Sequence, residues 1–184
     1  MNYAEIKTFD VANGPGIRVS LFVSGCNHRC PGCFNEQAWD FNFGQPFTQE
    51  TIDYIIDTLS FGAYQGVTFL GGEPMEPVNQ KGLLPLARKI KETYPEKDIW
   101  WYLDTRRWGS APHSGFEKDI IGHMYNECPE TKELLSYIDV LVDGPFIEAQ
   151  KNLNLVFRGS ENQRLIRIPE TLKTGNIVLW EKEM

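Results

Sequence analysis

The stretch of sequence that decides the fold is residues 17–33, which reads IRVSLFVSGCNHRCPGC. Its first seven residues are mostly β-branched, aromatic or aliphatic, and they predict a strand because such side chains suit a pleated backbone. The strand runs directly into three cysteines, Cys26, Cys30 and Cys33, in a C-x3-C-x2-C spacing. Three thiolates on one short loop can hold a metal centre, and a cluster of four irons would keep one iron free of protein ligands. An open metal position is typical of a reactive site and not of a structural one.

Outward from this stretch, β-rich apolar runs alternate with helical patterns along the chain. Such an alternation predicts an α/β fold in which right-handed crossovers connect the strands of a parallel sheet. The sequence contains no internal repeat and no linker, so residues 1–184 are expected to form a single domain. The further expected strands are residues 66–70, 98–103, 139–142, 165–168 and 176–180, and the expected helices are residues 48–59, 82–94, 116–125 and 131–137.

Four unusual sequences fall where the expected strands end. They are the cysteine loop, the GGEP run of Gly71–Pro74, Asp104–Thr105 and Asp143–Pro145. Reactive groups of parallel α/β sheets gather at the carboxyl ends of the strands. We therefore expect all four sequences to face one cleft, where the two aspartates either contact a cofactor or serve as turn and capping residues.

Composition and charge exclude several classes of function. The chain carries 18 basic and 25 acidic residues, a net charge of −7, which argues against non-specific binding of nucleic acid or of an anionic membrane. No signal peptide is visible, and no apolar run approaches the ~20 residues that a membrane helix needs. The expected compartment is the cytoplasm, where thiols stay reduced, so three cysteines within eight positions favour a metal site over disulfides.

Zinc is the alternative metal for the cysteine loop, with His28 as a fourth ligand. Structural zinc sites usually take paired ligands from two separate parts of the chain, and the sequence has no second pair because His113 and His123 are isolated. Cys128 also stands alone and is expected to be an ordinary thiol. The alternative is that Cys128 is a distant fourth ligand, which would close the open corner of the cluster. The residues by themselves leave both an iron–sulfur cluster and a zinc site open.

The cysteine loop is followed, one strand later, by the GGEP run. This combination resembles the radical S-adenosylmethionine superfamily. The resemblance implies that Cys26, Cys30 and Cys33 bind three irons of one [4Fe-4S] cluster. It also implies that the fourth iron takes the amino and carboxylate groups of S-adenosylmethionine.

The resemblance further assigns residues to the cofactor. Two adjacent glycines would let the backbone approach the methionine closely, because glycine has no side chain and few conformational limits. A carboxylate beside them would face the methionine ammonium. The implied cofactor-binding residues are Gly32, Phe34, Gly71, Gly72, Glu73 and Asp104.

Other motifs narrow the resemblance. The run NGPGIR, residues 13–18, resembles the activating enzymes of glycyl-radical proteins. Gly32, in place of the usual aromatic residue before the third cysteine, resembles the branch that activates the anaerobic (class III) ribonucleotide reductase. Four further features resemble the same branch: CPGCFN at residues 30–35, Trp39, VLVDGPF at residues 140–146 and FRGSENQR at residues 157–164.

Two segments depart from that branch. Leu103–Thr105 resembles instead the activating enzymes of pyruvate formate-lyase. Arg107–Pro129 is longer than the branch needs, and it is expected either to shape a partner interface or to be a solvated loop. The implied fold is an incomplete, open (β/α) barrel of mainly parallel strands with the cluster loop after the first strand, since a complete barrel takes about 250 residues.

The function that the resemblance implies is reductive cleavage of S-adenosylmethionine at the cluster. The 5′-deoxyadenosyl radical would then remove hydrogen from a glycine of the large catalytic subunit of anaerobic ribonucleotide reductase, after an electron donor such as flavodoxin has reduced the cluster. Three alternatives stay open. They are activation of another glycyl-radical enzyme, a small-molecule radical enzyme such as a deazaguanine synthase, and a non-enzymatic module stabilised by zinc.

Overall fold

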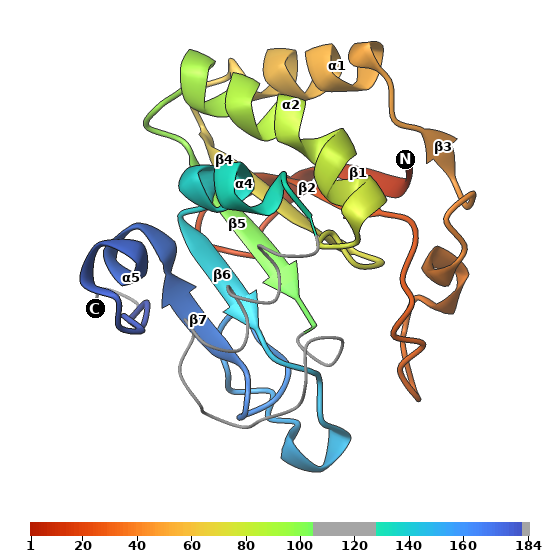
Figure 1. Ribbon diagram of the computed structural model, residues 1–184, viewed down its shortest axis with the longest axis vertical. Helices are drawn as coiled ribbons and strands as arrows, with labels where there is room; N and C mark the ends of the chain where they lie inside the picture. Colours follow the sequence, from red (N-terminus) through yellow and green to blue (C-terminus); the bar gives the residue numbers. More distant parts are fainter. Residues whose placement is uncertain (105–127, 182–184) are drawn as a thin grey trace.

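The computed structural model describes residues 1–104 and 128–181, and Figure 1 shows how its elements are arranged. The helix expected at residues 116–125, and nearly all of Arg107–Pro129, lie outside the described residues. The strands are β1 (Asn2–Asp10), β2 (Ile17–Val23), β3 (Gln45–Pro46), β4 (Tyr64–Gly71), β5 (Asp98–Leu103), β6 (Val140–Asp143) and β7 (Arg164–Arg167).

Within the described ranges, these strands form one seven-stranded sheet in the order β3-β1-β2-β4-β5-β6-β7. The four central strands, β2, β4, β5 and β6, run parallel, with Val19 beside Val67 and Phe69 beside Trp101. β1, β3 and β7 pair antiparallel at the two sides. The expected α/β fold with a mainly parallel sheet is confirmed. The sheet is open, with β3 and β7 at opposite edges, so the barrel curvature stays a prediction.

The helices gather mostly on one face of the sheet. Figure 1 shows α1, α2 and α4 over the central strands, with the N-terminus near β3 and the C-terminus near α5 at the other end. Among the described helices, none combines the length and the apolar character that a membrane crossing requires. The helices are η1 (Glu36–Trp39), α1 (Gln49–Leu59), α2 (Pro77–Thr93), α4 (Thr131–Tyr137), η4 (Glu148–Gln150) and α5 (Ile168–Thr174).

The main hydrophobic core lies between these helices and the sheet. In α1, the predicted apolar face packs inward because Ile52, Ile55, Ile56 and Leu59 recur at helical spacing and are all buried. Burial of such apolar surface is the main favourable term in folding, roughly 25 cal/mol per Å². The central strands contribute every second residue to this core: Val19, Leu21, Val23, Val67, Phe69, Ile99, Trp101 and Leu103.

The opposite face of the sheet holds a buried cation. The Arg18 side chain is fully buried, and its Nη2 lies 2.6 Å from Asp98 Oδ1. Arg18 Nε donates to Thr68 Oγ1 at 2.8 Å, and Nη2 donates to the carbonyl of Val67 at 2.8 Å. The guanidinium also stacks on the Trp100 ring, 5.5 Å from its centroid. These contacts join the arginine of the NGPGIR run to β4 and β5, across three parallel strands.

Four parts of the chain differ from the expectations. The sequence does not predict β1, because exposed Phe9 breaks the apolar–polar alternation of a strand with one buried face. α2 begins at Pro77 and not near residue 82. The prediction started too late because the polar residues of the first turn interrupt the apolar pattern. The strand expected at residues 176–180 is wrong: this segment makes only an isolated bridge from Leu179 to Ile166. The sequence also does not predict helix α5. This helix begins at Ile168, which is the last residue of the strand expected at 165–168.

The buried Arg18–Asp98 pair generates a stability prediction. Replacing Asp98→Ala leaves a fully buried guanidinium without its counter-charge, so the free energy of unfolding should fall by about 3 kcal/mol, as for one-sided breakage of buried pairs. Urea unfolding of the cofactor-free chain, followed by circular dichroism, measures the change. As a control, Asp53→Ala removes a surface pair with Lys89 (2.6 Å) and should leave the midpoint unchanged. Equal effects of the two substitutions would contradict the prediction.

Candidate functional site

The cysteine loop follows β2, and the chain then returns through η1, which hydrogen-bonds to the start of the loop. Gly25 N donates to the carbonyl of Ala38 at 2.8 Å, and Cys26 N donates to the carbonyl of Trp39 at 3.2 Å. The loop turns through three residues of positive φ, Gly25 (φ 97°), Arg29 (φ 47°) and Gly32 (φ 73°). No atom of the described residues lies within 4 Å of where a Cβ would stand on Gly32, so its glycine is explained by backbone conformation.

The three cysteines occupy different depths of the loop. Cys26 is buried at the root, whereas Cys30 and Cys33 are half-buried farther out. Cys30 Sγ lies 3.4 Å from Asp104 Oδ2, and the Asn35 amide donates to Cys33 Sγ at 3.4 Å. Burial, with a smaller effect of nearby carboxylates, raises the pKa of the Cys26 thiol to about 11. This thiol must therefore lose a proton when it becomes a metal ligand.

The GGEP run touches the cysteine loop through the backbone. Gly72 N donates to the carbonyl of Val23 at 2.8 Å, and Glu73 N donates to the carbonyl of Gly25 at 2.9 Å. Gly71 has φ 110°, and a Cβ on Gly72 would stand 2.6 Å from the carbonyl oxygen of Gly25. Both positions therefore need glycine. The first role of the two glycines is to let the GGEP run pack against the end of β2 and the cysteine loop.

The carboxylate of Glu73 joins three strand ends. It is 2% exposed, its Oε1 accepts from the Met75 amide at 2.8 Å, and its Oε2 accepts from the Asp104 amide at 2.9 Å. His28 Nε2 of the cysteine loop lies 3.3 Å from the same Oε2. These contacts confirm that the first three predicted strand-end sequences, after β2, β4 and β5, meet at one place.

Burial and the mutual charges set the protonation of this pair. Burial raises the pKa of the Glu73 carboxyl, against the opposing effect of His28. Burial of the imidazole acts to lower the pKa of His28, but the hydrogen bond and charge of Glu73 outweigh it, so that pKa is raised. Whatever their protonation, both oxygens of the Glu73 carboxyl group accept from backbone amides, those of Met75 and Asp104.

Within the part of the chain that the structure describes, the other predicted residues form no hydrogen bond with the Glu73 carboxyl group, although Asp143 lies beside Leu103 in the sheet. Asp143 at the end of β6 is buried and pairs with Arg164 of β7 through both carboxylate oxygens, so it has a local structural partner. Phe34 is 89% exposed, directly after the third cysteine. Cys128 is buried, and its Sγ donates to Glu130 Oε2 at 3.1 Å at the start of α4.

Sequence reasoning missed three polar residues at the site. Glu76 and Asn79, in the first turn of α2, and Asn27, between the first two cysteines, hydrogen-bond across the two loops. They follow no hydrophobic period and complete no motif. The only signal was their position, within six residues of the GGEP run or inside the cysteine loop.

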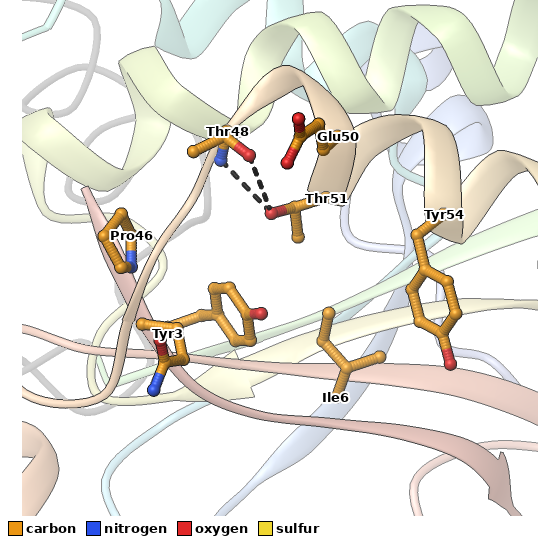
Figure 2. A pocket seen from close by; sticks show the side chains of 8 residues that line it. Tyr3, Ile6, Pro46, Thr48, Glu50, Thr51 and Tyr54 are labelled. Carbon is orange, nitrogen blue, oxygen red and sulfur yellow. Dashed lines mark hydrogen bonds between the residues drawn. The ribbon is translucent and has the colours of Figure 1, made fainter.

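A surface pocket elsewhere on the molecule is not this site. Figure 2 shows it between β1, β3 and the first turn of α1, where Thr48 N and Oγ1 approach Thr51 Oγ1 at 3.2 and 3.4 Å. Those contacts cap the helix. None of the predicted site residues belongs to its lining, which is Tyr3, Ile6, Gln45, Pro46, Thr48, Glu50, Thr51 and Tyr54.

The donor set of the loop fits an iron–sulfur cluster. Three thiols on one loop are the soft donors that iron–sulfur clusters take, and the half-buried Cys30 and Cys33 leave the outer side of the loop accessible. His28, the fourth ligand of the zinc alternative, has its Nε2 directed at Glu73, where the contact holds the loop in place. Within the described ranges, no three histidine, cysteine or acidic side chains are grouped closely enough to share a single metal ion.

Comparison with known proteins agrees with this geometry. Residues 12–166 match the model of the family described as "4Fe-4S single cluster domain", the class of protein that the fold and the cysteine loop define. The chain is also similar to individual proteins named anaerobic ribonucleoside-triphosphate reductase-activating protein. The relative from Vibrio cholerae is 39% identical over 170 residues, covering 91% of this chain and 98% of its own. The relative from Escherichia coli K12 is 38% identical over 165 residues, covering 89% and 96%.

A bacteriophage protein of the same name matches equally well. The protein from Enterobacteria phage T4 is 38% identical over 167 residues, covering 90% of this chain and 93% of its own. This chain therefore belongs to the family of the anaerobic ribonucleoside-triphosphate reductase-activating proteins.

The tight contact of Gly72 generates a second prediction. In Gly72→Ala the new methyl group meets the backbone of Gly25, which cannot rotate away, so the free energy of unfolding should fall by about 1–3 kcal/mol. Gly62→Ala is the matched control, because nothing lies within 4 Å of its Cβ position, and it should change stability by less than about 0.5 kcal/mol. Denaturant unfolding of the cofactor-free chain compares the two. A Gly72→Ala chain as stable as the control would refute the packing argument.

Proposed function

We propose that this chain reductively cleaves S-adenosylmethionine at a [4Fe-4S] cluster and makes the glycyl radical of an anaerobic ribonucleotide reductase, on its large catalytic subunit. The observation that carries the proposal is the three-cysteine loop bonded to the GGEP run through Gly72 N and Glu73 N. The names of the relatives, matched over nearly their whole length, support the same activity.

The cluster-binding residues in this proposal are Cys26, Cys30 and Cys33. When bound, the cluster would supply the electron for reductive cleavage of S-adenosylmethionine, the reaction that leads to hydrogen removal from a glycine of the partner. The protein would hold the three thiolates on one loop, and in this proposal the fourth corner takes S-adenosylmethionine instead of a side chain. Cys128, buried beside Glu130 at α4, serves the fold in this proposal.

The remaining predicted residues would shape the place of S-adenosylmethionine. Gly71 and Gly72 keep the backbone bare where the methionine would approach. We assign Glu73 a supporting role as well as a charge, since its carboxylate orders the Asp104 amide and His28. Gly32 and Phe34 follow on the outer part of the loop, and the exposed Phe34 ring offers an apolar surface to the cofactor.

The carboxyl edge of the open sheet would receive the partner. We propose that the sheet is an incomplete barrel whose open side admits a glycine-bearing loop of the reductase, because a macromolecular substrate needs more room than a small molecule. Reduction of the cluster falls to an electron donor such as flavodoxin in the cytoplasm. The acidic net charge of −7 supports the expectation that neither nucleic acid nor an anionic membrane is a partner.

Substitution of the loop cysteines tests the proposal. Cys26→Ala, Cys30→Ala and Cys33→Ala should each reduce S-adenosylmethionine cleavage to background, because each removes one of three thiolates from the cluster. The assay is anaerobic reconstitution, iron and sulfide analysis, and release of methionine and 5′-deoxyadenosine. Cys128→Ala is the control and should retain cleavage.

A second measurement identifies the substrate. Mixing the reconstituted chain with the large reductase subunit, S-adenosylmethionine and a reductant should give a glycyl signal in electron paramagnetic resonance. Cleavage by any of the three loop variants would overturn the cluster assignment. A glycyl signal on pyruvate formate-lyase and none on the reductase would reassign the partner, and one zinc in a colourless protein would favour the interaction module.

A further inference from the structure

The first turn of α2 holds both loops of the site through one buried amide. Asn79 is fully buried, and its Nδ2 donates to the carbonyl of Ser24 at 3.0 Å and to the carbonyl of Glu73 at 2.9 Å. Ser24 begins the cysteine loop, and Glu73 belongs to the GGEP run. One side chain therefore spans the two segments that the proposed cofactors would occupy.

A second side chain of the same turn reaches one residue past the first cysteine. Glu76 is 2% exposed, and its Oε1 accepts from the Asn27 backbone amide at 3.0 Å and from Asn27 Nδ2 at 2.9 Å. Together, Asn79 and Glu76 bracket Cys26, which lies between Ser24 and Asn27. The bracket therefore has two hydrogen bonds on each side, from the Asn79 amide to two carbonyls and from Asn27 to one carboxyl oxygen of Glu76.

The helix that carries these two residues is itself fixed. Leu83, Leu86 and Ile90 on its inner face are fully buried in the main core. Its cap residue, Glu76, is separated from the GGEP run by Met75 alone, so the helix begins just after the glycine loop ends. A rigid helix is a better reference for positioning a loop than another loop is.

We propose that Asn79 and Glu76 are positioning residues that hold Cys26 in register with the GGEP run before any cofactor binds. The chain would then present its first ligand already placed, and cofactor binding would have to order only the outer part of the loop. This inference rests on the proposed function for what the register is used for. The register itself is a property of the cofactor-free chain and can be tested there.

Hydrogen exchange in the reduced, cofactor-free chain is the direct test. The amides of Gly25, Cys26 and Asn27 are hydrogen-bonded to Ala38, Trp39 and Glu76 and should exchange slowly. In Asn79→Ala, peptides covering residues 24–30 should exchange about tenfold faster, because the hydrogen bonds from Asn79 to Ser24 and Glu73 are lost. Glu76→Ala should accelerate the same peptides. If Asn79→Ala fails to fold, Asn79→Asp keeps the shape, removes the two donors and should give the same result.

The chain offers a matched control in the next residue. Gln80 is also buried in the first turns of α2, but its Nε2 donates to Met75 O at 2.8 Å and its Oε1 accepts from Thr131 Oγ1 at 2.7 Å. Gln80→Ala therefore removes a buried amide of similar size that is bonded to α4 instead of the cysteine loop. Exchange at residues 24–30 no faster in Asn79→Ala and Asn79→Asp than in Gln80→Ala would overturn the inference.

A kinetic readout separates positioning from general loss of stability. In reconstituted enzyme, Asn79→Ala should raise the apparent KM for S-adenosylmethionine about tenfold at unchanged iron content, because two misaligned loops bind the cofactor less well. Gln80→Ala should leave that KM unchanged. An equal rise in both variants would show a merely structural role. If even the unsubstituted chain binds no cluster, the proposed function fails, whereas the exchange result still decides the positioning role.

Discussion

The structure depends on a backbone contact between the chain leaving β2 and the chain leaving β4. Gly72 N and Glu73 N donate to the carbonyls of Val23, at the end of β2, and Gly25, just beyond it. The contact is possible only because no side chain stands at residues 71 and 72. It continues the parallel pairing of β2 with β4 beyond the sheet, so the cysteine loop begins from a fixed point.

Buried polar groups give that point its uniqueness. Apolar packing alone tolerates many arrangements, whereas a buried carboxylate or amide must find defined partners because desolvation is costly. Glu73 meets the Met75 and Asp104 amides and His28, and Asn79 meets two carbonyls. An arrangement that shifted either loop would leave several of these groups unpaired.

Much of the fold could be predicted because hydrophobic period is a local property. The strand of residues 17–23 and the helix of α1 each carry their burial pattern in their own composition. β1 and the last segment could not be predicted in the same way. β1 is covered by β3 only at Asn2 and Tyr3 and has a single buried residue, so its sequence stays mixed. Residues 176–180 have strand-like composition, but beside β7 they form one isolated bridge, with backbone hydrogen bonds at Val178 and Trp180, instead of a strand.

The sequence by itself determined the cysteine triplet, the glycines and the parallel strands that bring them to one edge, because spacing and period are written in neighbouring residues. Only the tertiary structure decided that Glu73 faces inward, that His28 is its partner, and that Asn79 and Glu76 join the two loops. Those contacts connect residues 45 to 55 positions apart along the chain. No local pattern encodes them, since a buried polar residue is defined by partners that the folded chain brings to it.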